Sequence, residues 1–288
     1  MKIRTIASVA LAALLSACSP VRLLNALVPD AGFTASEGIA YGDDPRQKLD
    51  VYVPRGGEGT APSAGGRPVV VFFYGGSWNR GERSEYKFVA DALTSRGMVA
   101  VLADYRLYPQ VTYPAFLEDS ARAVAWARQN AANYGGDPSK LFVMGHSAGA
   151  YNAAMLALDP RWLAAVGLAP SQLAGWIGLA GPYDFLPSTV ADVKPVFHAP
   201  NYPKGAQPIE HAAGRSPRAF LGAAAKDSVV NPERSTLQLA SRLRAAGTPV
   251  TLKMYEGVSH ISLAAALARP LHGLAPVLDD VSAFVLAP

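Results

Sequence analysis

A serine with a glycine two positions away on either side stands near the middle of the chain, in the run Gly145-His146-Ser147-Ala148-Gly149. The apolar residues 141–144 precede this run and an alanine-rich stretch follows it, which predicts a strand, a sharp turn and a helix. A serine at such a turn has a strained backbone, so its neighbours must be small for strand and helix to pass closely. A serine hydroxyl is a poor nucleophile unless a base removes its proton. We therefore predict that Ser147 is a nucleophile, with a helix N-cap as the alternative role.

A base for this serine must be one of five histidines. His260 follows the alternating segment 250–255 and a Glu-Gly turn, so it is expected just past the carboxyl end of a late strand. Open parallel sheets carry their active sites at that edge. His146 lies beside the serine, where a packing or orienting role is expected. His198 and His211 lie in a proline-rich segment, and His272 lies in a helix-rich tail. We predict His260 as the base.

The acidic residue that orients the base should end another strand, ahead of the base in the chain. Asp227 closes the largely apolar run 219–226. The order Ser147, Asp227, His260 is that of α/β hydrolases and differs from the orders in chymotrypsin-like and subtilisin-like proteases. We predict Asp227 as the acid, with Asp184, which follows another apolar strand, as the alternative.

Acyl transfer also needs hydrogen-bond donors where negative charge develops on the attacked carbonyl oxygen, and losing one donor costs about 2.7 to 4 kcal/mol. The run Tyr74-Gly75-Gly76-Ser77-Trp78 follows the apolar segment 69–73, and its glycines allow backbone N–H groups to face a substrate. We predict the N–H groups of Gly76 and Ser77 as donors, together with that of Ala148 at the start of a helix. The alternative for the glycine run is a plain turn between strand and helix.

The elements that must position these residues alternate along the chain. Continuous apolar runs typical of strands buried on both faces occupy residues 68–74, 98–103, 141–144, 176–179 and 219–223. Helical stretches fall between them, at residues 85–95, 116–133, 148–158 and 232–246. This alternation predicts an α/β fold with a mostly parallel sheet and helices on both faces. Residues 38–53 are expected to form an opening hairpin, and residues 54–68 an exposed loop rich in Gly, Pro and Ser. Residues 182–208 are expected to form a proline-rich insert over the site.

Three motifs carry a family resemblance. Residues 74–78 are similar to the HGGxW loop of esterases related to hormone-sensitive lipase, kynurenine formamidase and prenylcysteine methylesterase. Residues 104–109 (DYRLYP) resemble the DYRLxP segment of these esterases, and residues 135–140 (GGDPSK) resemble the GGDPxxI segment that precedes their GHSAG run. The resemblance covers residue 38 to the C-terminus and implies an α/β-hydrolase fold, serine carboxylesterase activity on a small-molecule ester and no cofactor. Tyr74 stands where these esterases have a histidine, which changes the hydrogen bonding inside the loop, and we expect its ring to pack.

The substrate pockets are expected to draw on Trp78, Tyr105 and the aromatic residues of the 182–208 insert. Amidase or formamidase activity remains an alternative, because it uses the same triad and oxyanion hole. A non-catalytic envelope binding protein on the hydrolase scaffold is a second alternative, which the complete set of site residues disfavours.

Composition and motifs exclude several other classes. With 50% hydrophobic and 17% charged residues, the chain can fill the core of one large globular domain. The formal net charge is only +4 and no basic run occurs, so no nucleic-acid partner is predicted. The single cysteine excludes disulfides within the chain and a cysteine-rich metal site, and the sequence contains no HExxH or GxxxxGK motif. We predict no metal site.

The first 17 residues have the layout of a secretory signal peptide, with a basic start, an apolar stretch too short to span a membrane and then small residues. The run 15–18 (LSAC) resembles the bacterial lipobox, which implies cleavage before Cys18 and anchoring to the membrane through lipid on Cys18. Ser19 implies sorting to the outer membrane of the cell envelope. We predict a signal peptide at 1–17, a lipidated cysteine and tether at 18–37 and a catalytic domain at 38–288, with an ordinary signal cut nearby as the alternative.

Overall fold

The computed structural model describes residues 24–29, 31–55 and 65–287. The predicted signal peptide, Cys18 and the first part of the predicted tether lie outside the described residues. Within these three ranges, no helix has both the length and the apolar character that crossing a bilayer requires.

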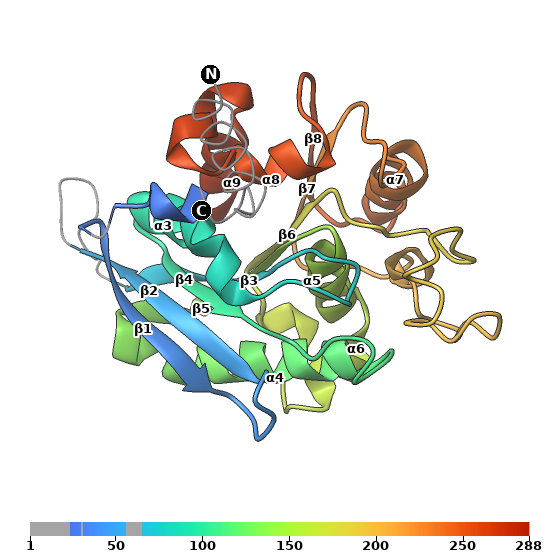
Figure 1. The fold of residues 1–288 in the computed structure, drawn as a ribbon, viewed down its shortest axis with the longest axis horizontal. Helices are drawn as coiled ribbons and strands as arrows, with labels where there is room; N and C mark the ends of the chain where they lie inside the picture. Colours follow the sequence, from blue (N-terminus) through green and yellow to red (C-terminus); the bar gives the residue numbers. More distant parts are fainter. Residues whose placement is uncertain (1–23, 30, 56–64, 288) are drawn as a thin grey trace, which may run out of the picture.

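Strands of the described chain form one eight-stranded sheet, with the bounds β1 (Phe33–Ala40), β2 (Lys48–Pro54), β3 (Arg67–Phe73), β4 (Val99–Ala103), β5 (Gly136–His146), β6 (Gly175–Leu179), β7 (Ala219–Ala224) and β8 (Val250–Tyr255). Their order across the sheet is β1-β2-β4-β3-β5-β6-β7-β8 (Figure 1). The pairs β1–β2 and β2–β4 are antiparallel, and the other pairs are parallel. The predicted mostly parallel sheet is confirmed. The predicted opening hairpin is present, but β1 begins at Phe33 rather than at residue 38, so residues 33–37 of the predicted tether belong to β1, which pairs with β2.

Helices cover both faces of this sheet (Figure 1). Helices α3 (Lys87–Ser95) and α9 (Val277–Leu286) pack together on one face, and α4 (Ala115–Asn130) and α5 (Ala148–Leu158) lie on the other. The shorter helices are α6 (Pro160–Ala164), α7 (Gln238–Ala245) and α8 (His260–Ala265). Strands β3, β4, β6 and β7 are almost entirely buried, as their continuous apolar sequences require. Strand β5 is buried from Leu141 to His146, whereas residues 137–140 are partly or fully exposed.

The bounds of several predicted elements shift in the structure. Strand β5 begins at Gly136 rather than at residue 141, because Gly136 already pairs with Arg67 of β3. Three predicted helices are shorter than expected, since a turn of different helical geometry replaces one end of each. These turns are the 3₁₀-helices Arg83–Tyr86 and Ala131–Tyr134 and the π-helix Glu233–Leu237.

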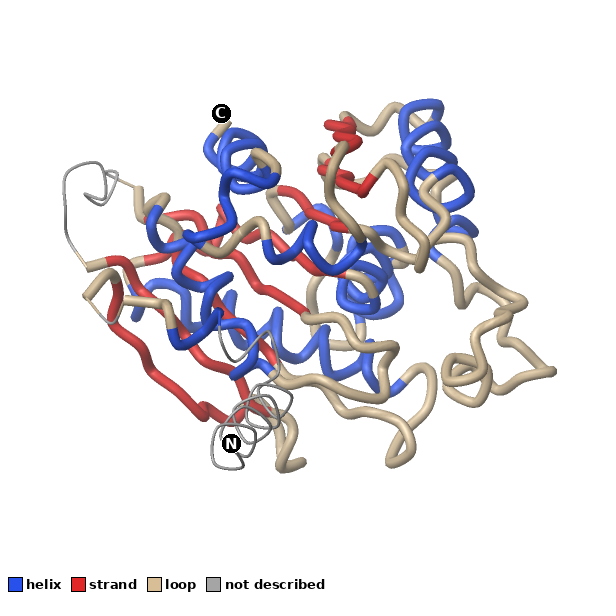
Figure 2. Tube along the Cα trace, turned by 45° about the horizontal axis from the view of Figure 1, so that its top comes forward, coloured by secondary structure: helices blue, strands red, loops and turns tan. Residues whose placement is uncertain are grey.

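The proline-rich insert lies over the carboxyl ends of the strands, as predicted. Residues 182–207 contain no helix or strand and run as loops beyond β6 and β7 (Figure 2). Two aromatic rings of the insert, Phe185 and Phe197, pack on Trp78 of the loop after β3, with ring centroids 5.8 and 4.8 Å away. This apolar contact holds the insert against the loop that carries the predicted oxyanion donors.

Candidate active site

Ser147 lies in the sharp turn between β5 and α5. Its backbone angles, φ 54° and ψ −121°, are unusual for a residue with a side chain. Two glycines make room for the turn: a Cβ at Gly145 would lie 2.1 Å from the Gly149 oxygen, and a Cβ at Gly149 would lie 2.0 Å from the Phe73 oxygen. The Ser147 side chain makes no cap hydrogen bond to α5, which speaks against the N-cap alternative.

The structure brings the three predicted triad residues together from three separate loops. Nε2 of His260 lies 2.9 Å from Oγ of Ser147, and Nδ1 of His260 lies 2.7 Å from Oδ2 of Asp227. The second carboxylate oxygen of Asp227 accepts hydrogen bonds from the N–H groups of Val229 (2.8 Å) and Val230 (3.0 Å). Both oxygens of the acid are thereby held, and the base is held between acid and nucleophile as activation of a serine requires.

The charge on Asp227 follows from these contacts. Burial alone would raise the pKa of this carboxyl, but the hydrogen bond from His260 and the two backbone N–H groups outweigh burial and lower the pKa below its usual value. The carboxylate therefore stays ionised and keeps a proton on Nδ1 of His260. Nε2 of the same ring is then free to accept the proton of the Ser147 hydroxyl.

His146 lies buried beside the base. Its Nε2 donates a hydrogen bond to the carbonyl oxygen of His260 at 2.8 Å, and the two ring centroids are 4.9 Å apart. Burial and the neighbouring His260 ring lower the pKa of His146 to about 3. The ring therefore stays neutral at neutral pH and ties the backbone of the base to the strand that carries the nucleophile. This is an orienting role, as expected.

The remaining candidates make other contacts. Oδ1 of Asp184 pairs with Nη2 of Arg234 at 2.9 Å, so this carboxylate is engaged away from the base. The rings of the three other histidines are each hydrogen bonded to a backbone carbonyl oxygen: His198, His211 and His272.

The loop after β3 packs directly on the nucleophile, since a Cβ at Gly75 would lie 3.0 Å from Cβ of Ser147. Gly76, Ser77 and Trp78 all have positive φ, at 128°, 53° and 58°. A Cβ at Gly76 would lie 2.3 Å from the Arg80 oxygen, so only glycine fits there. The loop thus turns sharply just where it passes Ser147.

Two of the three predicted oxyanion donors lie at the cavity beside Ser147. Ser77 and Ala148 line this cavity, whereas Gly76 is not among its lining residues. Within the described part of the chain, the N–H groups of these three residues donate no backbone hydrogen bond. The N–H groups of Ser77 and Ala148 therefore lie at the cavity, where they can donate to a developing oxyanion. Gly76 shapes the turn that presents Ser77, and its own role as a donor stays a prediction.

The cavity beside Ser147 has a volume of about 230 Å³. Trp78 contributes to its lining as predicted, held by a hydrogen bond of 3.0 Å from its indole N–H to Oδ1 of Asn152. Apolar lining comes mainly from the insert and from the segment after Asp227: Phe185, Pro187, Val190, Val193, Val229 and Val230. Besides Ser77 and Ser147, the polar lining comes from the same two segments: Asp184, Ser188, Thr189, Asn231, Arg234 and Ser235.

Tyr105 does not line this cavity, and its predicted role in substrate binding is wrong. Its side chain is fully buried, its hydroxyl donates to the carbonyl oxygen of Tyr74 at 2.8 Å, and the two rings stack with centroids 4.7 Å apart. The DYRLYP segment therefore supports the loop after β3 from the side away from the cavity. The Tyr74 hydroxyl accepts a hydrogen bond from Arg46 at 2.7 Å, and the ring packs as expected.

Sequence reasoning missed the polar residues of the cavity, Ser188, Thr189, Asn231 and Arg234. No motif or spacing marks them, because they lie in loops whose paths only the folded chain defines. Across the described ranges, no cluster of three or more histidine, cysteine or acidic side chains is arranged to hold a metal ion.

Comparison with known proteins gives two family matches. The model of the prolyl oligopeptidase family matches residues 117–279, and the BD-FAE model matches residues 49–165. The probable isoprenylcysteine alpha-carbonyl methylesterase ICMEL1 of Arabidopsis thaliana is 27% identical over 86% of this chain and 55% of its own length. Esterase LipC of Mycobacterium tuberculosis is 30% identical over 72% of this chain and 54% of its own length. The chain thus spans about half the length of these curated relatives.

Solved structures share the fold. A truncated carbohydrate esterase from gut microbiota superimposes with a TM-score of 0.72 at 17% identity, covering 89% of this chain and 97% of the other. Thermogutta terrifontis esterase 2 with bound butyrate gives a TM-score of 0.69 at 23% identity, covering 90% and 95%. Together with the sheet order, these similarities confirm the predicted α/β-hydrolase fold.

The contacts of the two candidate acids lead to a first prediction. Asp227→Asn should lower kcat/KM for a short ester by about 10⁴, because an amide can hold His260 in the wrong tautomer and cannot stabilise its protonated ring. Asp184→Asn should cost far less, because Asp184 pairs with Arg234. Steady-state kinetics on both variants, after circular dichroism has shown native folding, make the comparison. A larger loss in Asp184→Asn would show that the acid is misassigned and would leave Ser147 and His260 in place.

The burial of His146 leads to a second prediction. Its folded-state pKa of about 3 lies below the unfolded value of about 6.5, so between these values the unfolded chain binds a proton that the folded chain does not. The free energy of unfolding should therefore fall with decreasing pH in this window, by about 1.4 kcal/mol per pH unit from this residue. His146→Gln should flatten the curve by that amount in urea unfolding measured between pH 7 and pH 4. Equal slopes for the two proteins would contradict the burial of a neutral His146.

Proposed function

The chain belongs to the prolyl oligopeptidase family, and from this membership and the geometry at Ser147 we propose that it is a serine hydrolase that cleaves carboxylic esters. One observation carries the proposal: an unbroken chain of hydrogen bonds links Asp227, His260 and Ser147, beside a cavity with backbone donors. The names of the relatives support the reaction type, since both the plant protein and LipC are esterases.

The reaction begins when His260 takes the proton of the Ser147 hydroxyl and the serine oxygen attacks the ester carbonyl carbon. The carbonyl oxygen becomes negatively charged and accepts hydrogen bonds from the N–H groups of Ser77 and Ala148. His260, now positively charged, is stabilised by the ionised Asp227 and gives its proton to the leaving alcohol. The acyl group stays on Ser147 as an ester.

Release of the acyl group repeats the same steps with water as the nucleophile. His260 takes a proton from water, the hydroxide attacks the acyl carbon, and the second oxyanion occupies the same pair of donors. The proton then returns to the Ser147 oxygen as the carboxylic acid leaves. Every proton transfer in this cycle uses Nε2 of one histidine, and no cofactor takes part.

The size of the cavity favours small substrates. Pockets that enclose drug-sized ligands measure about 300 to 1,000 Å³, and the cavity beside Ser147 measures about 230 Å³. The rings of Trp78 and Phe185 form part of its lining. Short acyl chains fit this space, whereas a long chain exceeds it.

A third prediction tests the reaction. Protein that starts after Cys18 should hydrolyse p-nitrophenyl acetate, propionate and butyrate faster than the octanoate, and Ser147→Ala should reduce turnover by about 10⁶. Stopped and continuous assays at neutral pH measure both effects, and p-nitroanilides of the same acids measure amidase activity. Faster cleavage of the anilides would favour the amidase alternative. A wild-type protein that binds these compounds without turnover would favour the binding-protein alternative.

We also propose that lipid on Cys18 anchors the enzyme to the bacterial cell envelope, at the outer membrane. The proposal rests on the run 15–18 and on Ser19, which the structure leaves undescribed. Several acyl chains on one residue give stable anchoring, whereas a single chain binds a membrane only marginally.

A fourth prediction tests this anchor. The full-length chain expressed in a bacterial host should incorporate labelled fatty acid and fractionate with the outer membrane. Cys18→Ala should abolish both effects and leave ester hydrolysis intact, because residue 18 precedes the folded domain. Label that persists in Cys18→Ala would contradict lipidation at this residue.

A further inference from the structure

The loop that carries the predicted oxyanion donor Ser77 depends on support from outside itself. Ser77 and Trp78 both have positive φ, a strained backbone conformation for residues with side chains. Inside the loop, the N–H groups of Asn79 and Arg80 donate to the Gly76 oxygen at 3.1 and 3.2 Å, which closes a tight turn. These bonds shape the loop but do not attach it to the rest of the fold.

Arg46, in the turn between β1 and β2, contacts both ends of this loop. Its Nη2 donates to the hydroxyl of Tyr74 at 2.7 Å and to the carbonyl oxygen of Gly81 at 2.8 Å. Its Nε donates to the carbonyl oxygen of Tyr105 at 3.1 Å. The guanidinium therefore links Tyr74 at the start of the loop, Gly81 at its end, and Tyr105, whose ring stacks on Tyr74.

The two ends of the loop also touch each other at this point. A Cβ at Gly81 would lie 2.8 Å from the ring of Tyr74, so the chain can close here only with glycine. Tyr74 is fixed further by stacking on Tyr105 and on Tyr86, with centroids 4.7 and 5.8 Å away. Burial and the Asp104 carboxylate raise the pKa of Tyr74 well above its usual value, so the hydroxyl stays protonated.

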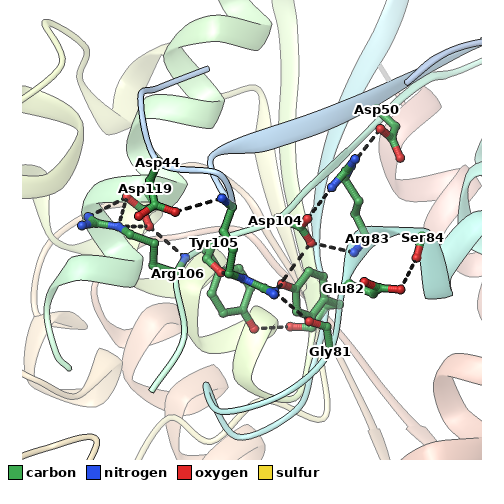
Figure 3. Close-up of polar contacts among 12 residues, drawn as sticks. Asp44, Asp50, Gly81, Glu82, Arg83, Ser84, Asp104, Tyr105, Arg106 and Asp119 are labelled. Carbon is green, nitrogen blue, oxygen red and sulfur yellow. Dashed lines mark hydrogen bonds and ion pairs between the residues drawn. The ribbon is translucent and has the colours of Figure 1, made fainter. Parts of the chain in front are cut away.

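Charged residues hold Arg46 itself in place. Figure 3 shows Asp104, Gly81 and Tyr105 at this point, with the side chain of Arg83 between Asp50 and Asp104. Oδ1 of Asp104 lies 3.9 Å from Nη2 of Arg46, and the same oxygen accepts a hydrogen bond from the backbone N–H of Arg83 at 2.7 Å. Asp104, itself held by Arg83, thus places a negative charge beside the guanidinium of Arg46.

We propose that Arg46 is a positioning residue for the oxyanion hole, and that the Tyr74 hydroxyl is one of the acceptors through which it acts. The inference rests on the proposed ester hydrolysis. Gly75 lies so close to Ser147 that a Cβ on it would come within 3.0 Å of Cβ of Ser147, so a shift of this loop changes the distance from the Ser77 N–H to the oxyanion. A misplacement of about 1 Å at a reacting group can cost about 10² in rate. Tyr74 stands where the similar esterases have a histidine, and Arg46, which is distant from it in the sequence, donates a hydrogen bond to its hydroxyl.

The test compares Arg46→Ala, Arg46→Lys and Tyr74→Phe with the wild-type protein. We expect Arg46→Ala to lower kcat for p-nitrophenyl acetate roughly 10- to 100-fold with KM within about twofold, because the lost interaction acts on the transition state. Arg46→Lys should lose less, since a lysine keeps the charge but can reach only one end of the loop. Adding Tyr74→Phe to Arg46→Ala should cause no further loss, because the hydroxyl acts through the arginine.

A trifluoromethyl ketone inhibitor supplies the readout that simple destabilisation would not change. The adduct of this inhibitor with Ser147 carries an oxyanion, so in each variant the inhibition constant should rise by about the factor by which kcat falls. Titration with a fluorophosphonate counts reactive Ser147, so all rates are expressed per active site. Arg269→Ala is the matched control: this partly exposed arginine also makes two short hydrogen bonds, both to Asp91, and its loss should leave kcat and the inhibition constant unchanged.

Two results would overturn the proposal. One is a folded Arg46→Ala protein with kcat within about twofold of wild type. The other is a loss of activity that disappears when rates are expressed per titrated Ser147, with the inhibition constant unchanged. If wild-type protein turned over no ester, the proposed function would fail, and the dissociation constants of the same variants for the ketone, measured by calorimetry, would still judge the role of Arg46.

Discussion

The contact between helix α5 and strand β3 at the nucleophile is the constraint on which the rest of the site depends. Gly149 lies so close to the Phe73 backbone that a Cβ would come within 2.0 Å of its carbonyl oxygen. This approach forces Ser147 into its strained turn and lifts its hydroxyl above the carboxyl edge of the sheet. It also places the loop that follows Phe73 directly beside the serine. Nucleophile and oxyanion loop are therefore positioned by one backbone contact rather than by two independent ones.

The parallel sheet supplies the remaining triad residues because the carboxyl ends of its strands share one edge. Asp227 follows β7 and His260 follows β8, and these strands are neighbours in the sheet. Their loops are tied down locally: backbone N–H groups after Asp227 hold its free oxygen, and His146 holds the carbonyl of His260. The electrostatics are equally local, since an ionised acid and a neutral His146 leave the base as the group that changes protonation in the cycle.

The oxyanion loop shows how strain at a functional site is balanced by packing elsewhere. Trp78, one of its two non-glycine residues in the left-handed region, packs in an aromatic cluster, and Arg46 contacts Tyr74 and Gly81 at the two ends of the loop. Phe185 and Phe197 of this cluster belong to the proline-rich insert, which also lines the cavity, whereas Phe116 and Tyr151 come from α4 and α5. The insert therefore has two effects at once, because it limits the space for substrate and presses Trp78 into place.

Several features follow from the sequence alone, because their causes act over only a few residues. The glycines around Ser147 are required because a side chain there would collide with the backbone of the turn, and the apolar runs indicate strands buried on both faces. The chain order of Ser147, Asp227 and His260, each at the end of a predicted strand, predicts which three side chains meet. Their meeting in the structure needed no information beyond strand order and the edge at which loops gather.

The tertiary structure alone decided the partners of side chains that no local pattern links. Tyr105 belongs to a recognisable motif, but only the folded chain shows that its ring stacks under Tyr74 and misses the cavity. Arg46 lies in a turn without a catalytic motif, and its contacts with Tyr74 and Gly81 arise because the β1–β2 hairpin returns beside the loop after β3. The orientation of His146 and the polar lining of the cavity have the same origin. Hydrophobic periodicity and backbone sterics are determined by residues that are close together in the sequence. A side-chain hydrogen bond depends instead on which distant segments the fold brings within about 3 Å of each other.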